Sequence, residues 1–88
     1  MEITHLQDKK TFIAQEGGKK LGHMTYTLQE GVVNFNHTFV EPAARGLGVA
    51  QQLVDAGAKF VQEAGYRAMG SCSYADKVLK RSYPQLLK

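Results

Sequence analysis

Hydrophobic and polar residues alternate with a period of two in the first half of the chain, which is typical of β-strands. Three β-prone runs follow one another: Thr11–Gln15, Leu21–Leu28 and Val33–Val40. The third run places four side chains on one predicted face: Val33, Phe35, His37 and Phe39. Glycine-containing turns at 16–19 and 29–31 separate the runs. We therefore predict an antiparallel meander of three strands.

The pattern changes to helical intervals in the second half. Apolar positions recur every three or four residues over Val49–Ala64, and Gly65 follows where a C-terminal cap belongs. A fourth strand is predicted over Tyr66–Ser71, and a short helix over Ser73–Arg81 with Ser73 as its N-cap. A strand, a helix and another strand form a right-handed crossover, so the last strand should lie parallel to the third. The predicted fold class is α/β, or α+β in some schemes, in a single domain over residues 1–88.

Length and composition exclude several classes of protein. With 88 residues, the chain has room for one small domain. No apolar run approaches the ~18 residues of a membrane span, and Met1–His5 lacks the build of a secretory signal. One cysteine and three scattered histidines offer no spacing suited to a structural zinc site. We expect a cytoplasmic protein that holds no metal and does not act at a membrane.

Charge is unevenly distributed along the chain. Residues 1–44 carry four lysines and five acidic residues, whereas residues 45–88 carry seven lysines or arginines and three acidic residues. The second half, at net +4, should therefore attract anions. A nucleic acid, a phosphorylated ligand and a plain solvated helix face all remain compatible with this charge.

The segment Glu41–Ala50, which joins the third strand to the long helix, points to a phosphate ligand. No Ser, Thr, Asp or Asn stands at the expected N-cap, so the first amides of the helix need another acceptor. Gly46 and Gly48 would let a bulky anion approach the backbone, and Arg45 adds a charge at the rim. Val49 and Ala50 follow Gly48 where a Walker loop needs Lys and then Ser or Thr, and Gln51 replaces the third glycine of a dinucleotide fingerprint.

Arg45-x-x-Gly48-x-Ala50 resembles the motif with which the GNAT superfamily of N-acetyltransferases binds the pyrophosphate of acetyl-coenzyme A. The resemblance covers about residues 10–85 and implies a GNAT-like fold in which the third and last strands splay apart. It implies coenzyme contacts from three segments: Thr38, Phe39 and Val40 on the strand; Arg45, Gly46, Leu47, Gly48, Val49 and Ala50 on the loop; Ser73, Lys77, Lys80 and Arg81 on the last helix. The chain departs from the family at Phe39, where short members usually carry an acid, and lacks the tyrosine of the last helix.

Cys72 and His37 are the candidate catalytic residues. Cys72 stands between the last strand and the last helix, where the helix dipole lowers the pKa of a thiol and makes it more reactive. On a neighbouring parallel strand, His37 could reach Cys72 as a base, although a buried structural role suits both residues as well. No role is assigned to His23, or to His5 in a terminus that we expect to be frayed.

These features favour a minimal acetyl-coenzyme A-dependent N-acetyltransferase. A chain this short cannot enclose its acceptor, so we expect an open site for an amine such as a protein lysine, a polyamine or a chain terminus. Two alternatives stay open. The departures at Phe39 and in the last helix suit a coenzyme A-binding module without activity, and the basic second half suits a small nucleic-acid-binding protein, although few aromatic residues accompany it.

Overall fold

A computed structural model describes the whole chain, residues 1–88. Five strands form one sheet in chain order: β1 (Glu2–Leu6), β2 (Thr11–Glu16), β3 (Lys19–Gln29), β4 (Val32–Val40) and β5 (Arg67–Gly70). The two α-helices are α1 (Val49–Ala64) and α2 (Ser73–Ser82). Three single turns of 3-10 helix complete the chain: η1 (Gln7–Lys9), η2 (Pro42–Ala44) and η3 (Pro84–Leu86).

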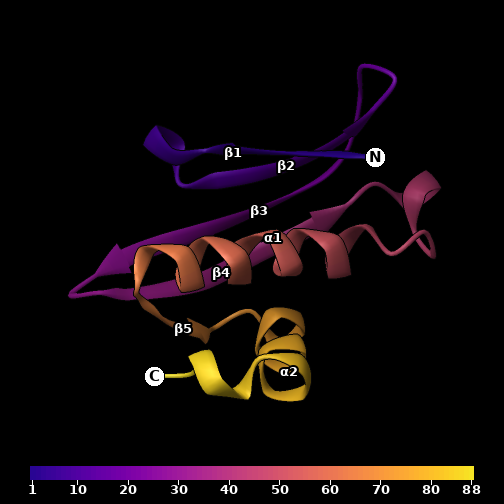
Figure 1. Cartoon of the computed structure of the whole chain (residues 1–88). Helices are drawn as coiled ribbons and strands as arrows, with labels where there is room; N and C mark the ends of the chain where they lie inside the picture. Colours follow the sequence, from indigo (N-terminus) through magenta and orange to yellow (C-terminus); the bar gives the residue numbers. More distant parts are fainter.

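The topology confirms the predicted fold class. The first four strands are antiparallel to their neighbours, and β5 lies parallel to β4. Helix α1 makes the crossover between these two strands and lies across the sheet, while α2 lies beside β5 (Figure 1). The protein is therefore an α+β domain, a meander followed by a β-α-β crossover and a C-terminal helix.

Both helices cover the same face of the sheet. A Cβ atom on Gly57 of α1 would lie 2.7 Å from the ring of Phe35 on β4. Gly70 of β5 pairs with Phe35, and a Cβ atom on Gly70 would lie 2.6 Å from the backbone nitrogen of Asp76 in α2. Because paired residues of adjacent strands point to the same side, α1 and α2 share one face. The opposite face, called the open face below, has no helix over it.

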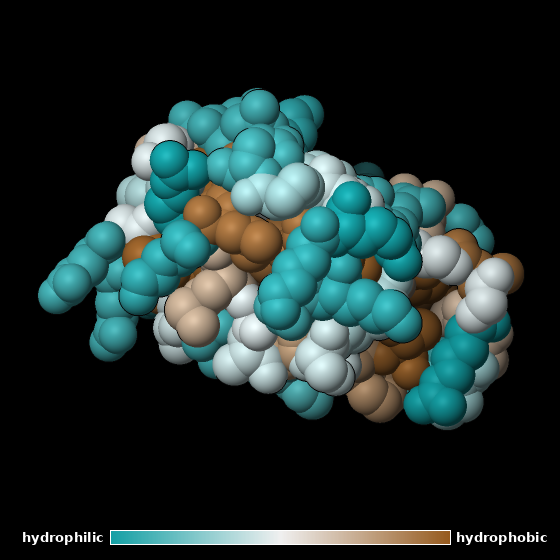
Figure 2. All heavy atoms as spheres, turned by 90° about the horizontal axis from the view of Figure 1, so that it is seen from below, coloured by the Kyte–Doolittle hydropathy of each residue, from teal (hydrophilic) through white to brown (hydrophobic).

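The core lies between the sheet and the two helices. Its largest fully buried side chains include Phe12, Met24, Phe35, Leu53 and Leu79. Seen from the side of β5 and α2, apolar atoms reach the surface only in separate patches between polar side chains (Figure 2). No helix is both long and apolar enough to cross a membrane, and no cluster of three His, Cys, Asp or Glu side chains is suited to a metal ion.

The expectation of a frayed N-terminus was wrong. Residues 2–6 form β1, which pairs with β2 at the edge of the sheet. The ring of His5 stacks on Phe12 with centroids 4.0 Å apart, and His5 Nε2 lies 2.7 Å from the hydroxyl of Tyr26. Burial lowers the pKa of His5 below its ordinary value. His5 is thus a structural residue that joins β1 to the core.

A β-bulge in β4 overturns the predicted alternation of that strand. Tyr26 pairs with Phe35, but the preceding Thr25 pairs with His37, so Asn36 is an extra residue. An extra residue moves every later side chain to the opposite face. His37 and Phe39 therefore lie on the open face, away from Phe35, and both are exposed.

The parallel strands separate soon after they meet. β4 and β5 pair only from Val32 with Arg67 to Phe35 with Gly70, and the amide of Cys72 then donates to the carbonyl of Phe35 at 3.2 Å. β4 continues to Val40 without a partner on that side. We call this gap the split; it confirms the predicted splaying of the two strands.

Gly70→Ala tests how closely α2 packs on the sheet. The added Cβ would collide with backbone atoms of α2, so the helix must shift, and we expect a loss of about 1–3 kcal/mol in the free energy of unfolding. Urea denaturation measures this loss. Ser71→Ala is the matched control: Ser71 is exposed, and its amide keeps its 2.9 Å hydrogen bond to Asn34 Oδ1. Equal stability of the two variants would contradict the packing described.

Candidate functional site

The loop before α1 presents a row of unpaired backbone amides. Gly48 is the N-cap of α1, and no side chain caps the helix. Five amides have no acceptor within the protein, those of Gly46, Gly48, Val49, Ala50 and Gln51. Together with the positive end of the helix dipole, such amides attract an anion.

Glycine is required in this loop for its backbone conformation. Gly46 has φ +88° and Gly48 has φ +77°, both in the left-handed region that residues with a Cβ rarely adopt. Both glycines lie before the helix, so they carry none of the cost of glycine within a helix. A Cβ on either would find no atom within 4 Å, so their outer side is open to a ligand.

A groove of about 250 Å³ runs beside this loop. One side is formed by the end of β4, the loop and the first turn of α1, with Val40, Arg45, Gly48, Val49 and Ala50 among its lining residues. The other side is Tyr74 in the first turn of α2, 38% exposed. The groove therefore leads from the unpaired amides towards the start of α2, next to Cys72.

Cys72 lies at the mouth of the split and is half-buried. Its Sγ atom is 3.5 Å from Thr38 Oγ1 on β4. The amides of Tyr74 and Ala75 at the start of α2 approach the sulfur, although neither meets the strict geometry of a capping hydrogen bond. Burial raises the pKa of the Cys72 thiol, but contacts with the Ala75 amide, the Thr38 hydroxyl and further amides outweigh it, so this pKa lies below its ordinary value.

The backbone of β4 faces the split at alternate residues. The amide of Thr38 points at the Cys72 sulfur. The amide of Glu41 donates to Leu21 of β3 at 2.8 Å, so the groups of Val40, one residue before, face the same way as those of Thr38. The backbone groups of Phe39 face β3 instead, and its side chain, 36% exposed, lies on the open face. Of the three predicted strand residues, two present backbone groups to the split.

His37 does not lie where a base for Cys72 would have to be. The bulge turns its ring to the open face, whereas the side chain of Thr38 contacts the sulfur. The predicted pairing of His37 with Cys72 is therefore wrong. The ring of His37 lies beside that of His23 on β3 instead, with centroids 5.7 Å apart.

The four polar residues predicted on the last helix differ in their surroundings. Ser73 and Lys77 are exposed and form no hydrogen bond or ion pair through their side chains. Lys80 pairs with Asp76 at 3.0 Å. Arg81 donates to Gln51 Oε1 of α1 at 2.8 Å. Lys77 is thus the cation of α2 that is most free to meet a ligand.

Arg81 belongs to a network that joins the two helices. Gln51, which receives the bond from Arg81, donates to Asp55 Oδ1 at 3.0 Å. Tyr83 donates to the same carboxylate oxygen at 2.6 Å, and this bond, burial and the negative charge raise the pKa of Tyr83 to about 12. Gln51 also lines the groove. The network therefore fixes α2, with Tyr74, opposite the loop.

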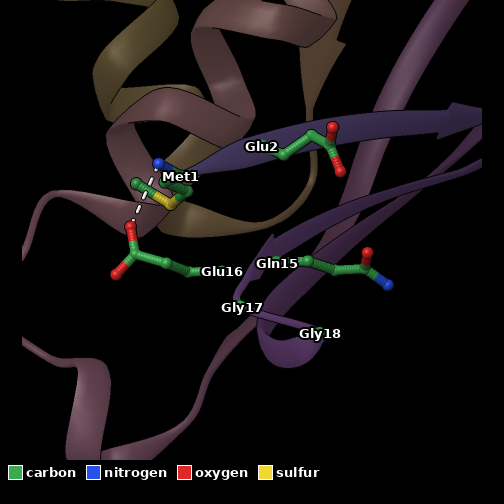
Figure 3. Close-up of a pocket in the computed structure, with 6 residues that line it drawn as sticks. All are labelled: Met1, Glu2, Gln15, Glu16, Gly17 and Gly18. Carbon is green, nitrogen blue, oxygen red and sulfur yellow. Dashed lines mark ion pairs between the residues drawn. The ribbon is translucent and has the colours of Figure 1, made fainter.

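A separate hollow of about 340 Å³ lies at the turn between β2 and β3 (Figure 3). The Met1 amino group there is 3.1 Å from Glu16 Oε1. Its lining includes Glu2 and Glu16 but no nucleophile and no basic side chain. It shares no residue with the groove, and its acidic character does not suit a phosphate.

Comparison with models of known protein families identifies the family of this chain. The model of the family described as GCN5-related N-acetyltransferase matches residues 11–86. This chain belongs to that family. A GCN5-related fold accounts for the split between β4 and β5 and for the glycine loop at the start of α1 that the sequence resemblance implied.

One curated relative matches part of the chain. The chain is 40% identical over 58 residues to Protein NATD1 from Bos taurus, which covers 65% of this chain and 51% of that protein. The chain thus spans about half the length of this curated relative.

Two solved structures also align with this GCN5-related protein. The solution structure of a candidate GCN5-like N-acetyltransferase from Staphylococcus aureus aligns with TM-score 0.72 and 26% identity, over 99% of this chain and 87% of that one. The aminoglycoside N-acetyltransferase AAC(6')-Iy, in a complex with CoA, aligns with TM-score 0.60 and 27% identity, over 81% of this chain and 63% of that one.

Tyr74 and Gln51 are the groove residues that sequence reasoning missed. Tyr74 had a local signal, because it is an aromatic residue in the first turn of a helix that follows a central strand. Gln51 had none, since the contact that holds it beside the groove comes from another element.

Proposed function

We propose that this protein is an acetyl-coenzyme A-dependent N-acetyltransferase with an open acceptor site. The unpaired amides of Gly46 and of residues 48–51 are the observation that carries the proposal, because they form an anion site beside a groove that leads towards Tyr74, next to Cys72 in the chain. AAC(6')-Iy, whose fold is similar, was solved in complex with CoA. The pyrophosphate of the coenzyme binds these amides, and Arg45 supports it from the rim.

The acyl end of the coenzyme lies in the split. Its pantetheine arm takes the place of the missing strand neighbour along β4 and bonds to backbone groups of Thr38 and Val40. The amide of one of these residues polarises the thioester carbonyl as negative charge develops on its oxygen. Cys72, at the mouth of the split, lies beside that carbonyl.

The reaction transfers an acetyl group from sulfur to nitrogen. The lone pair of a neutral amine attacks the thioester carbon, the carbon–sulfur bond breaks, and the coenzyme leaves as a thiolate while the new amide nitrogen loses a proton. Attack occurs directly on the coenzyme, or on an acetyl group first moved to Cys72. Positioning and polarisation supply most of the rate, because proton transfer typically adds about 10²–10⁴-fold.

Calorimetry with coenzyme A, followed by a thiol-release assay, tests this function. We expect binding of coenzyme A, and release of its thiol from acetyl-coenzyme A in the presence of spermidine or a lysine-containing peptide. Binding without thiol release with any amine would favour a coenzyme-binding module instead. Salt-sensitive binding of RNA or DNA, without binding of coenzyme A, would favour a nucleic-acid-binding protein instead.

The exposed cations Arg45 and Lys77 should contribute smaller, salt-dependent amounts to the affinity for coenzyme A. Arg45 and Lys77 form no ion pair within the protein. We expect Arg45→Ala and Lys77→Ala each to raise the Kd of coenzyme A several-fold at low salt and less at high salt, because exposed charges are screened. Lys59→Ala, an exposed lysine of α1 outside the groove, is the matched control. Equal effects of all three variants would mean that net charge alone attracts the coenzyme.

A further inference from the structure

One edge of the sheet lacks a partner. β1 is the outermost strand, beyond β2 (Figure 1). At the opposite edge the end of the chain pairs with β5: Ala68 forms a parallel bridge with Leu87, and its carbonyl accepts the amide of Lys88 at 2.9 Å. β1 has no such cover, and it contains no proline, no lysine and no bulge, the features that usually protect an exposed edge. It is therefore free to pair with another strand.

The register of the sheet shows which backbone groups of β1 are free. The amide of Tyr26 on β3 donates to the carbonyl of Lys10, just before β2, at 3.0 Å. Backbone groups of successive residues point to opposite sides of a strand, so Ile13, three residues after Lys10, bonds to β1 and not to β3. Thr4, the partner of Ile13, therefore bonds to β2. The amides and carbonyls directed outward are those of its two neighbours, Ile3 and His5.

A hollow of about 280 Å³, called the edge hollow below, lies beside this edge between β1 and α1. Four residues of α1 on one stripe line it: Ala56, Lys59, Phe60 and Glu63. Ile3 and Phe60 are half-buried, whereas Lys59 and Glu63 are exposed and form no ion pair within the protein. The edge thus combines free backbone groups, apolar surface and one free charge of each sign.

These features are complementary to a second copy of the same chain. When another β1 lies antiparallel with Thr4 opposite Thr4, Ile3 of each copy faces His5 of the other, and every outward amide meets a carbonyl. The two-fold axis of this pairing is normal to the sheet, so both α1 helices lie on the same face and run in opposite directions. Lys59 of one copy then lies on the side of Glu63 of the other, and opposite charges across an interface favour the matching partner.

We propose that β1 is a dimerisation edge through which two copies of this chain join their sheets. Backbone bonds between Ile3 and His5 hold the strands together, and the apolar side chains of both edge hollows face each other across the axis. The dimer is weak, because one short strand and one helix stripe bury little surface. The edge hollow shares no residue with the groove, so the groove of each copy stays open. This inference does not depend on the proposed function.

Charge reversal, followed by sedimentation velocity over a concentration series, tests the dimer. We expect the wild type to dimerise below about 1 mM. Lys59→Glu and Glu63→Lys should each raise the Kd of the dimer at least about ten-fold, because like charges then face each other at both ends of the helix stripe. Lys88→Glu, which makes the same change in net charge at an exposed residue outside the edge hollow, should dimerise as the wild type does.

An equimolar mixture of Lys59→Glu and Glu63→Lys separates a contact across the axis from a loss of stability. Every facing pair in the mixed dimer again has opposite signs, so mixing should restore dimerisation, whereas it would not repair two damaged folds. A mixture that stays monomeric while the wild type dimerises would overturn the proposal.

Hydrogen exchange measures the same contact at single amides. The amides of Ile3 and His5 should exchange more slowly as the protein concentration rises, whereas the amide of Thr4, already bonded to β2, should change much less. A wild type that stays monomeric up to about 1 mM would overturn the proposal. A dimer in which the amides of Ile3 and His5 keep their monomer exchange rates would overturn it as well.

Discussion

Gly48→Val should raise the Kd of coenzyme A at least about 100-fold. Gly48 has φ +77°, which a β-branched residue adopts only with strain. Its backbone amide is one of the five that have no hydrogen-bond acceptor within the protein. Valine would either force the loop into another conformation and turn these amides away, or place its methyl groups on the open side, where we propose that the pyrophosphate binds. Isothermal calorimetry on the folded variant measures the loss.

Gly31→Val is the control for backbone strain. Gly31 also has φ +77° with open space at its Cβ position, but it lies in the turn between β3 and β4. Both variants should lose similar stability in urea denaturation, whereas only Gly48→Val should lose coenzyme binding. Equal binding by these two folded variants would place the anion site elsewhere.

The glycine loop and the helix behind it were predictable because their signals are local. The interval of apolar positions over Val49–Ala64 gave the helix its observed bounds, and the missing N-cap side chain at Gly48 indicated unpaired amides. Strand β1 had a local signal as well. Ile3 and His5 alternate with exposed Thr4, but the run is short and polar enough to have been taken for a frayed end.

The bulge of β4 could not be predicted in the same way. Nothing in the alternation of Val33, Phe35, His37 and Phe39 marks Asn36 as an extra residue, because a bulge is set by the register with the neighbouring strand. Its consequence is large, since it moves His37 from the side of Cys72 to the open face. The alternation was correct for Val33 and Phe35 and wrong from the bulge onward.

The role of Arg81 also depended on a contact distant in sequence. The family resemblance grouped it with Lys77 and Lys80 as a ligand-binding cation, but its guanidinium donates a hydrogen bond to Gln51 of α1 at 2.8 Å. A long side chain on a helix surface can point in several directions, and the position of the neighbouring helix determines which of them it takes. Part of the positive charge of residues 45–88 therefore has partners within the protein, since Arg81 contacts Gln51 and Lys80 contacts Asp76.

Iodoacetamide should modify native Cys72 faster than a free thiol at pH 7. The thiolate is the reacting form, and the amides of α2 and the Thr38 hydroxyl lower the pKa of this thiol. Bound coenzyme A should protect it, because we propose that the thiol end of the coenzyme lies in the same split. Thr38→Val should slow the modification by removing the hydroxyl, whereas Thr27→Val on the open face should not. Intact-mass spectrometry follows each reaction.

A Cys72 that reacts only after unfolding would remove it from the site. In that case Cys72→Ala should chiefly lower the stability, by about 1–2 kcal/mol, because it removes a half-buried side chain from its contact with Thr38. Reduced turnover with unchanged stability points instead to the site. The reactivity of Cys72 towards iodoacetamide and the stability of the variant separate a packing role from a functional one, and neither measurement requires the acceptor.

Acetyl-coenzyme A without an amine distinguishes the two routes of transfer. If Cys72 carries the acetyl group, the protein mass should rise by one acetyl group at this thiol, and both Cys72→Ser and Cys72→Ala should abolish turnover. If the amine attacks the coenzyme directly, the mass should stay unchanged, and Cys72→Ala should bind coenzyme A and keep a measurable fraction of its activity. The geometry allows either route, because Cys72 Sγ and the Thr38 amide lie next to each other in the split. In both routes the proposed polarising amide would act on a thioester carbonyl, and only the sulfur that holds the acetyl group differs.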